Sequence, residues 1–150
     1  MEQTLIIVKP DGVQRGLVGE VLARFERRGL KLAGLRLMQI DRALAERHYA
    51  VHQGKPFYEG LVNYITSGPV VVAIIEGPDA IAVVRRVIGA TRSNEAASGT
   101  IRGDFALTVD RNIIHASDAA DTARFEVGLY FQPDQVLSYK RDLDRWVVPA

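Results

Sequence analysis

The stretch Asn112–Asp118 places one histidine, His115, between an isoleucine pair and a short polar run. Asparagine, serine and aspartate side chains such as those around it hydrogen-bond backbone groups and begin helices. An imidazole held there in one orientation is a neutral nucleophile near pH 7. The stretch is predicted to be a helix-capping turn, with Ser117 or Asp118 as the cap. On these residues alone, His115 is either a structural histidine or a nucleophile.

Side chains that can bind phosphate are scattered along the rest of the chain. Lys9 ends the first apolar run, Arg85 and Arg86 lie on a predicted helix, and Thr91 and Arg102 lie in a polar segment. Each charge by itself is typical of a solvated surface. Collected in one cleft, they would offer a polyphosphate charge-assisted contacts of roughly 1.5–3 kcal/mol each.

Several familiar functional motifs are absent from the sequence. There is no P-loop, no dinucleotide-binding glycine motif, no hydrolase nucleophile elbow and no histidine pair with zinc-site spacing and a third ligand. His48 and His52 are four residues apart but have no glutamate beside them, and they are interpreted as surface histidines. If the chain binds phosphates, it must do so through side chains.

Hydrophobic periodicity indicates how these residues are positioned. Residues 90–104 have almost nothing to bury and are predicted to be a long polar loop, either functional or disordered. The tail 133–150 is predicted to pack against the body or a neighbouring subunit. The other expected elements are a buried strand at 5–8 ending in a turn at 9–12, a helix at 17–28, a half-exposed strand at 30–37 with a bulge near Gly34, helices at 41–49 and 57–65, a central strand at 70–75, a helix at 80–88, a last strand at 105–109 and a helix after 118.

This order of elements fits an α/β (α+β) sandwich of the ferredoxin-like βαββαβ type. Such a fold has a four-stranded antiparallel sheet covered by helices, here with the long polar loop and a C-terminal extension added. A small doubly wound sheet stays open as an alternative. With 150 residues, the chain is expected to form a single domain, 1–150.

Composition restricts the class of protein. The 25% charged residues and the near-even hydrophobic fraction are typical of a globular protein, and the net charge of +1 gives no support to nucleic acid as a partner. The absence of cysteine excludes disulfides and thiol catalysis. The apolar runs are too short for a signal peptide or a membrane span. A cytoplasmic enzyme or binding domain is expected.

Four separate motifs, in order, resemble the nucleoside diphosphate kinase family, and the resemblance runs from about Thr4 to the tail. The motifs are Val8–Gly16, Ser67–Val70, Gly99–Phe105 and Asn112–Asp118. The resemblance implies a ping-pong reaction that moves the γ-phosphate of a nucleoside triphosphate, mainly ATP, to a nucleoside diphosphate and so maintains NTP and dNTP pools. The phosphate would be carried as a phosphohistidine on His115.

The resemblance also assigns catalytic residues. His115 would attack through Nδ1, Glu126 would accept a hydrogen bond from the second ring nitrogen, and Ser117 would contact the same glutamate. Lys9 and Tyr49 would contact the transferred phosphate.

The remaining site residues are expected to bind the nucleotide: Arg85 and Thr91 at the β-phosphate, Arg102 near the γ-phosphate, Phe57 and Val109 on opposite sides of the base, and Asn112 with Lys9 at the sugar hydroxyls. The resemblance implies Mg²⁺ as cofactor, held mainly by the nucleotide phosphates with no direct protein ligand. Relatives are hexamers or tetramers, and a homohexamer is expected from the long tail.

The chain departs from the family pattern at two places. Arg92-Ser93 replaces the usual Asn-Pro, which frees the loop backbone and costs up to ~1 kcal/mol of order. Ala116 follows the histidine where many relatives have glycine, so position 116 must avoid positive φ. Counting back from Gly89 favours Arg85 over Arg86 as the clamp. The alternative function is a ferredoxin-like nucleotide-binding regulatory or interaction module without turnover.

Overall fold

A four-stranded antiparallel sheet, in the order β2-β3-β1-β4, forms the centre of the protein in the computed structural model, which describes residues 1–148. The two inner strands are β1 and β3, and β1 pairs with β3 over its whole length, while β2 and β4 form the edges. The strands are β1 (Glu2–Val8), β2 (Lys31–Met38), β3 (Val70–Gly77) and β4 (Ile114–Ala116). The ferredoxin-like prediction is confirmed, and an antiparallel sheet excludes the doubly wound alternative.

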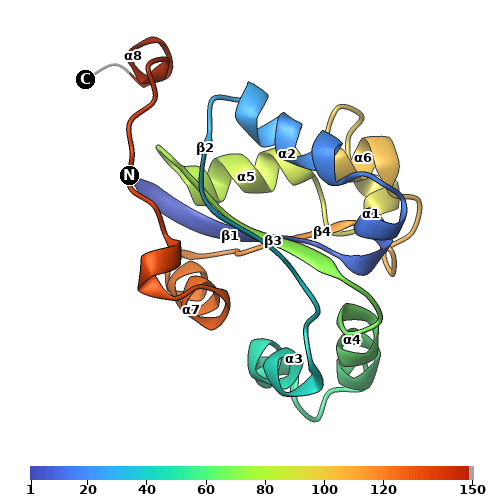
Figure 1. The fold of residues 1–150 in the computed structure, drawn as a ribbon. Coiled ribbons are helices and arrows are strands. Elements are labelled where there is room, and N and C mark those ends of the chain that lie inside the picture. The colour runs from blue at the N-terminus through green and yellow to red at the C-terminus, as the bar shows by residue number, and fades with distance from the viewer. Residues whose placement is uncertain (149–150) are drawn as a thin grey trace.

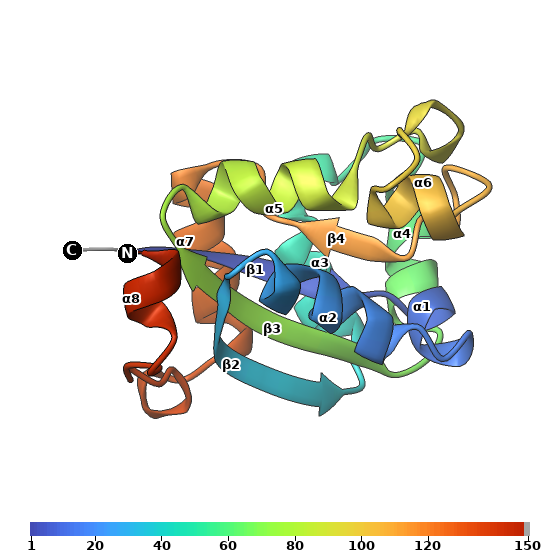
Figure 2. The same ribbon diagram turned by 90° about the horizontal axis from the view of Figure 1, so that it is seen from above.

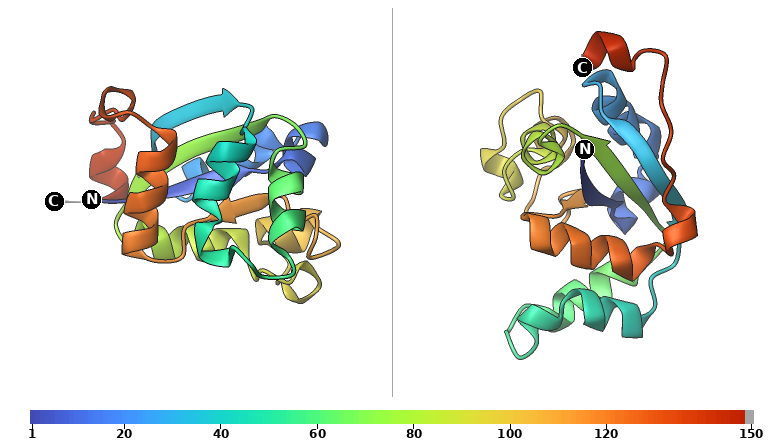
Figure 3. Two further views of the ribbon diagram at one scale, coloured as in Figure 1. Left: turned by 90° about the horizontal axis from the view of Figure 1, so that it is seen from below. Right: turned by 90° about the vertical axis from the view of Figure 1, so that its left-hand side faces the viewer.

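Helices cover both faces of the sheet (Figure 1). Helices α2 and α5 lie on one face, and Figure 2 shows them from above; α3, α4 and α7 lie across the other face (Figure 3). The helices are α1 (Pro10–Gln14), α2 (Val18–Arg27), α3 (Arg42–His48), α4 (Tyr58–Ile65), α5 (Ala80–Ile88), α6 (Ile101–Phe105), α7 (Ala120–Tyr130) and α8 (Asp144–Val147), with short 3₁₀ turns η1 (Ala50–His52), η2 (Ser93–Glu95) and η3 (Pro133–Gln135).

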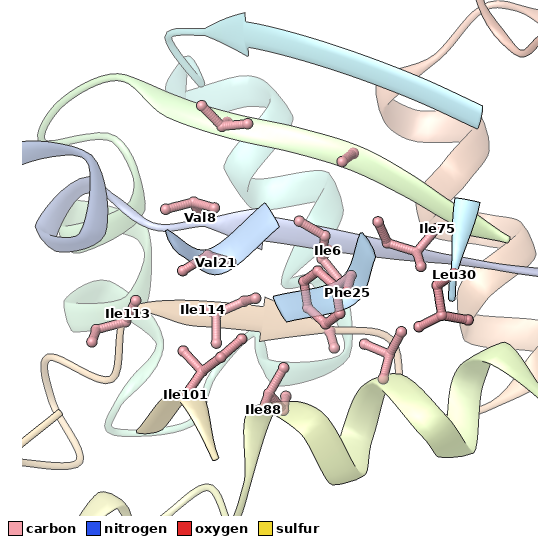
Figure 4. Close-up of a cluster of buried hydrophobic side chains, with 14 of the residues drawn as sticks. Ile6, Val8, Val21, Phe25, Leu30, Ile75, Ile88, Ile101, Ile113 and Ile114 are labelled. Atoms are coloured by element: carbon pink, nitrogen blue, oxygen red, sulfur yellow. The ribbon is translucent and has the colours of Figure 1, made fainter. Parts of the chain in front are cut away.

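The sheet separates two hydrophobic cores. Alternate residues of β1 enter different cores: Ile6 and Val8 pack against α2 and α5, while Leu5 and Ile7 pack against α3, α4 and α7. Figure 4 shows the first core, with Phe25 of α2 lying between the sheet and α5. Because β1 is buried on both faces, its sequence is a continuous apolar run rather than an alternating one.

Two local features predicted from the sequence, a β-bulge and a helix cap, are confirmed. The register of β2 against β3 shifts between Leu32 and Gly34, at the predicted bulge. Asp41 accepts a hydrogen bond from the backbone N–H of Leu44 at 2.8 Å and begins α3 as expected.

Two predicted loops contain helices instead. The predicted turn at 9–12 is wrong, because α1 begins at Pro10 directly after β1, with proline at the first helical position where its missing N–H costs nothing. The segment 90–104 is not structureless: it contains η2 and the start of α6. Thr100 caps α6 by accepting the N–H of Gly103 at 3.0 Å.

The last strand was predicted at the wrong place. Residues 105–109 are mostly apolar, but Phe105 ends α6, and Leu107 is 86% exposed among the described residues. The strand is β4, inside the histidine stretch, so the predicted helix-capping turn is also wrong. Helix α7 begins after Ala119, whose methyl side chain cannot act as a cap, and the Ser117 hydroxyl is bonded to Glu126 instead.

The described part of the tail, residues 133–148, packs against the body of the same chain. The N–H of Leu137 donates to the Ala33 carbonyl at 2.8 Å, and Arg141 donates to the carbonyls of Gly29 and Leu30. Trp146 is 77% exposed. The final two residues of the predicted tail segment lie outside the described residues. Among residues 1–148 no helix has the length and apolar character needed to cross a membrane.

Ser93, which stands where the family usually has proline, offers a test of loop order. It begins η2, is 4% exposed, and its hydroxyl has no hydrogen-bond partner among the described residues. Arg92 before it is extended (φ −79°, ψ 102°), which is the conformation that a following proline requires. We expect Ser93→Pro to raise the free energy of unfolding by about 0.4–1 kcal/mol, measured by denaturant titration.

Ser93→Ala is the matched control for this variant, since it removes the unpaired hydroxyl without restricting the backbone. The proline variant should be the more stable of the two. If it is less stable than Ser93→Ala, the backbone at position 93 does not suit proline and the expectation is wrong.

Candidate active site

A strained turn precedes the histidine. Ile113 has φ of 73°, in the left-handed region that β-branched residues avoid, and the Ile114 N–H donates to the Asn112 carbonyl at 2.7 Å, closing a three-residue γ-turn. Surrounding elements hold the turn: the Asp11 carboxylate accepts the Ile113 N–H, and the Lys9 N–H donates to the Ile113 carbonyl at 2.8 Å. Such strain persists only where neighbours enforce it, and it often marks a functional site.

Close packing at α1 is part of this support. A Cβ at Gly12 would lie 3.1 Å from the Ile113 carbonyl oxygen and 2.7 Å from Cγ1 of Val8, so a larger residue would push α1 away from the turn. Position 116, by contrast, lies in β4 with ordinary extended pairing to Ile6. Ala116 therefore needs no positive φ, and the unusual backbone is three residues earlier.

Side chains of β4 alternate between the two faces of the sheet, and this alternation determines the direction of His115. Ile114 and Ala116 point into the core beside α2 and α5, so His115, paired with Ile7, points to the opposite face beneath α3 and α7. There its Nε2 lies 2.8 Å from Oε1 of Glu126, and its side chain keeps 22% exposure. Among the described residues, the second ring nitrogen, Nδ1, has no hydrogen-bond partner, and the ring lines the cleft.

Glu126 on α7 receives a second donor. The Ser117 hydroxyl donates to the same Oε1 at 2.7 Å, and the glutamate is 4% exposed. Burial disfavours the ionised form, but the hydrogen bonds from His115 and Ser117 and the nearby imidazoles hold the pKa of Glu126 below its ordinary value. At neutral pH the group is therefore an anion that accepts the Nε2–H of His115.

His48 is a buried residue, so its interpretation as a surface histidine is wrong. It ends α3 with 8% exposure, its Nδ1 lies 2.8 Å from the Tyr130 hydroxyl, and its Nε2 lies 3.5 Å from Oε2 of Glu126. Burial, followed by the proximity of His115, lowers the pKa of His48 to about 4. His52, by comparison, is half-buried at the cleft wall.

His115 opens into a cleft of about 1620 Å³. The cleft is lined by almost every residue that the sequence singled out, drawn from segments far apart in the chain. Arg85 is half-buried in the wall, whereas Arg86 beside it is exposed and does not line the cleft. The predicted residues that line it are Lys9, Tyr49, Phe57, Arg85, Thr91, Arg102, Val109, Asn112, His115 and Glu126; Ser117 is buried behind the wall.

One end of the cleft is basic. The Lys9 ammonium donates to Oδ1 of Asn112 at 2.8 Å, and burial, reinforced by Arg102, lowers the pKa of Lys9 to about 8. Arg85 donates to the Ala116 carbonyl at 3.2 Å, reaching past the edge strand β4 into the cleft. Tyr49 stays a neutral hydroxyl, because burial raises its pKa to about 12.

Arg102 has a larger structural role than the sequence indicated. It is 3% exposed, and its guanidinium donates to the carbonyls of Asn112, Gly89 and Ile114. Burial lowers the pKa of Arg102 to about 10, so the group remains cationic at neutral pH. The guanidinium binds the residues on both sides of the γ-turn, and its remaining N–H donors stay available at the cleft wall.

The other end of the cleft is apolar and open. Phe57 is 51% exposed and Val109 is 45% exposed, as expected of side chains that await a ligand. The ring of His52 meets Phe57 edge-on at 5.2 Å, and the Lys55 ammonium lies 5.7 Å from the Phe57 ring centre. This end can accept a flat ring.

Sequence reasoning missed four residues that position the site. His48 and Tyr130 lie behind His115, and Tyr64 donates a hydrogen bond to Asp11, whose other oxygen holds Ile113. His48 could have been recognised as buried, because it lies three residues after Ala45 on the buried stripe of α3. The γ-turn has no comparable sequence signal.

Comparisons with known proteins identify the family. The family model for nucleoside diphosphate kinase matches residues 2–136. The chain is 60% identical over 148 residues to the nucleoside diphosphate kinase of Thermomicrobium roseum, covering 99% of each chain, and 56% identical over 147 residues to that of Carboxydothermus hydrogenoformans, covering 98% and 99%. The chain belongs to the nucleoside diphosphate kinase family.

Solved structures of nucleoside diphosphate kinases agree. A halophilic nucleoside diphosphate kinase from Halobacterium salinarum, solved in complex with CDP, superposes with a TM-score of 0.95 at 48% identity and 97% coverage of both chains. The protein is therefore an enzyme of phosphoryl transfer from nucleoside triphosphates to nucleoside diphosphates. A nucleotide-binding module without turnover is not favoured.

Proposed function

We propose that the enzyme works by a ping-pong mechanism in which Nδ1 of His115 carries the phosphate. The observation that carries this proposal is the 2.8 Å contact between Nε2 of His115 and buried, anionic Glu126. An acceptor on Nε2 fixes the proton there, so Nδ1 presents its lone pair to the cleft. Ser117 supports the arrangement by holding the same carboxylate oxygen.

The chemistry follows from that tautomer. Nδ1 attacks the γ-phosphorus, an N–P bond forms, and the P–O bond to the β-phosphate breaks, releasing the nucleoside diphosphate. The ring keeps its Nε2–H and gains positive charge, which the Glu126 anion stabilises, as a carboxylate does in other histidine-dependent sites. The second half-reaction reverses these steps, with an oxygen of the acceptor diphosphate attacking the phosphohistidine.

The cleft supplies binding groups for each part of the nucleotide. Lys9, Tyr49 and Arg102 would contact the transferred phosphate, and Arg85 with Thr91 the β-phosphate. The base would stack on Phe57 opposite Val109, and Asn112 with Lys9 would bind the sugar hydroxyls. Because phosphoryl transfer depends mainly on positioning and charge neutralisation, these contacts would account for most of the rate enhancement. Stacking accepts any base, so broad nucleotide use is expected.

Mg²⁺ is the proposed cofactor, held mainly by the nucleotide phosphates. Among the described residues, the only cluster of three metal-ligating side chains is His48, His115 and Glu126, which is hydrogen-bonded and rich in nitrogen, unlike a magnesium site. Asp118 and Asp121 are exposed carboxylates on the cleft wall, available to the water shell of the ion. When bound, Mg²⁺ neutralises phosphate charge. EDTA should abolish turnover and excess Mg²⁺ should restore it; activity that survives EDTA would contradict the proposal.

A labelling experiment tests the phosphohistidine. The purified protein is incubated with γ-³²P-labelled ATP, then separated from nucleotide and given unlabelled GDP. We expect one acid-labile, base-stable label per chain that passes completely to GTP. A wild-type protein that takes up no label would refute the covalent mechanism and would revive the module without turnover.

Lys9 gives the proposal a pH dependence. With its pKa lowered to about 8, the ammonium is charged below pH 8 and neutral above it, so attraction for phosphate is lost as pH rises through this value. We expect kcat/KM, which reports the free enzyme, to be level below about pH 8 and to fall above it. Lys9→Met should lower kcat/KM by about 10–100-fold, the value of one charge-assisted contact. The substitution should also remove the fall in kcat/KM at alkaline pH. If kcat/KM of the variant still falls there, the ionisation belongs to another group.

We further propose a homohexamer in the cytoplasm, with residues 1–150 acting as one catalytic domain. The support for the hexamer is the length of the tail, in which Trp146 remains 77% exposed. Sedimentation velocity would distinguish a hexamer from a tetramer.

A further inference from the structure

Two buried side chains beside Glu126 have no part in the proposed transfer. His48 ends α3 and Tyr130 ends α7, and these helices lie side by side on one face of the sheet (Figure 3). The Tyr130 hydroxyl is 2.8 Å from Nδ1 of His48, and Nε2 of His48 is 3.5 Å from Oε2 of Glu126. The contacts form a line from Tyr130 through His48 and Glu126 to His115.

Hydrogen bonding decides where the single proton of the neutral His48 ring lies. Burial raises the pKa of the Tyr130 hydroxyl, so it remains protonated and can donate to Nδ1. The ring proton then lies on Nε2 and faces the carboxylate. The reverse arrangement would place the Nε2 lone pair against the Glu126 anion in a buried site, which is electrostatically unfavourable.

The surroundings of His48 keep it in this neutral state. Burial is the main factor, and cations nearby oppose protonation, whereas the Glu126 anion favours it. The neutral ring therefore acts as a fixed donor rather than as an acid. The titratable groups that face it are His115 from β4, Glu126 and Tyr130 from α7, Lys9 after β1, Tyr49 after α3 and His52 from η1.

We propose that Tyr130 and His48 are positioning residues that lock the orientation of Glu126. Tyr130 sets the tautomer of His48, and the Nε2–H of His48 faces Oε2 at 3.5 Å. Oε1 is then left facing His115 and Ser117, which donate to it at 2.8 and 2.7 Å. With Oε1 hydrogen-bonded and Oε2 facing His48 at 3.5 Å, rotation of the carboxylate away from the nucleophile is disfavoured. This inference rests on the proposed role of His115 as the phosphate carrier.

Three variants test the inference in the full-length enzyme. Tyr130→Phe keeps the ring packing and removes only the hydroxyl. In His48→Gln the amide nitrogen can occupy the position of Nε2 and donate to Glu126, whereas in His48→Asn the shorter amide reaches only the position of Nδ1. Each variant is studied by ¹⁵N NMR of the histidine rings without nucleotide, and by kcat and KM in the steady state.

In the wild type we expect His48 to be protonated on Nε2 alone. Tyr130→Phe should give a mixture of His48 tautomers and lower kcat by about 3–10-fold, the rate equivalent of one net hydrogen bond, with KM unchanged. His48→Gln should retain several-fold more kcat than His48→Asn. Tyr139→Phe is the matched control: it removes a hydroxyl of the tail that donates to the Leu32 carbonyl of β2, and both kcat and the His48 tautomer should match the wild type.

Other results would overturn the inference. These are an unchanged tautomer and kcat in Tyr130→Phe, equal kcat in His48→Gln and His48→Asn, or a change in KM rather than in kcat. Failure of the proposed function would be seen in a different experiment, as a wild-type protein in which His115 takes up no label. The His48 tautomer is measured without any nucleotide and does not depend on that result.

Discussion

Replacing His115 by glutamine should lower kcat by on the order of 10⁴-fold or more and abolish labelling by γ-³²P-labelled ATP. The reason is that the proposed reaction has a covalent intermediate, and a side chain without a nucleophilic nitrogen cannot form it. Glutamine retains an amide that can reach Glu126, so the buried carboxylate keeps a donor. Steady-state kinetics and the label on the purified variant are the measurements.

Binding should survive this substitution. Lys9, Arg85 and Phe57 line the cleft independently of His115, so ADP affinity measured by calorimetry should change by less than tenfold. His52→Gln is a matched histidine substitution at the apolar end of the cleft and should still take up label. A His115→Gln protein that retains label would assign the phosphate carrier to another residue.

Truncating Glu126 to alanine should lower kcat by about 10²–10⁴-fold, the range seen when a histidine loses the partner that fixes its tautomer. In this variant Nε2 of His115 loses its acceptor at 2.8 Å, and the ring can then place its proton on Nδ1, where it blocks attack. The substitution also removes the anion that stabilises positive charge on the ring. Pre-steady-state phosphorylation by ATP isolates this step from product release.

Glu126→Gln separates the two effects of the carboxylate. The amide oxygen can still accept the His115 N–H, but the charge is gone, so kcat should lie between the values for wild type and Glu126→Ala. A Glu126→Ala enzyme with more than a tenth of wild-type kcat would show that tautomer control by Glu126 is unimportant. Equal loss in both variants would assign the whole effect to charge.

Much of the fold was predictable because its signals are local. The apolar run at 5–8, the stripe of α5 and the Asp41 cap each reflect the environment of neighbouring residues, and each was confirmed. The strand at 105–109 failed because a short apolar run in the sequence does not reveal whether a partner strand is available. The true edge strand, β4, has only three residues and offers too short a pattern to recognise.

Some residues of the site were likewise predictable from the sequence, and others were not. The residues that line the cleft were identified because their motifs resemble those of a known family. His48 and Tyr130 were missed since their importance depends on a contact between α3 and α7, 82 positions apart, which no local pattern encodes. The γ-turn at Ile113 was missed because its backbone conformation is imposed by Asp11 and Arg102 rather than preferred by isoleucine.

The pairing of β4 with β1 has a consequence for how the protein comes to be active. His115 lies opposite Ile7, and Lys9 donates a hydrogen bond to Asn112, 103 residues later in the chain. The cleft therefore cannot form until most of the chain that follows β1 has been synthesised. Contacts of such long range form slowly. A partly folded or nascent chain would have no cleft to bind nucleotide, and the recovery of nucleotide binding during refolding would report the joining of the last strand to the first.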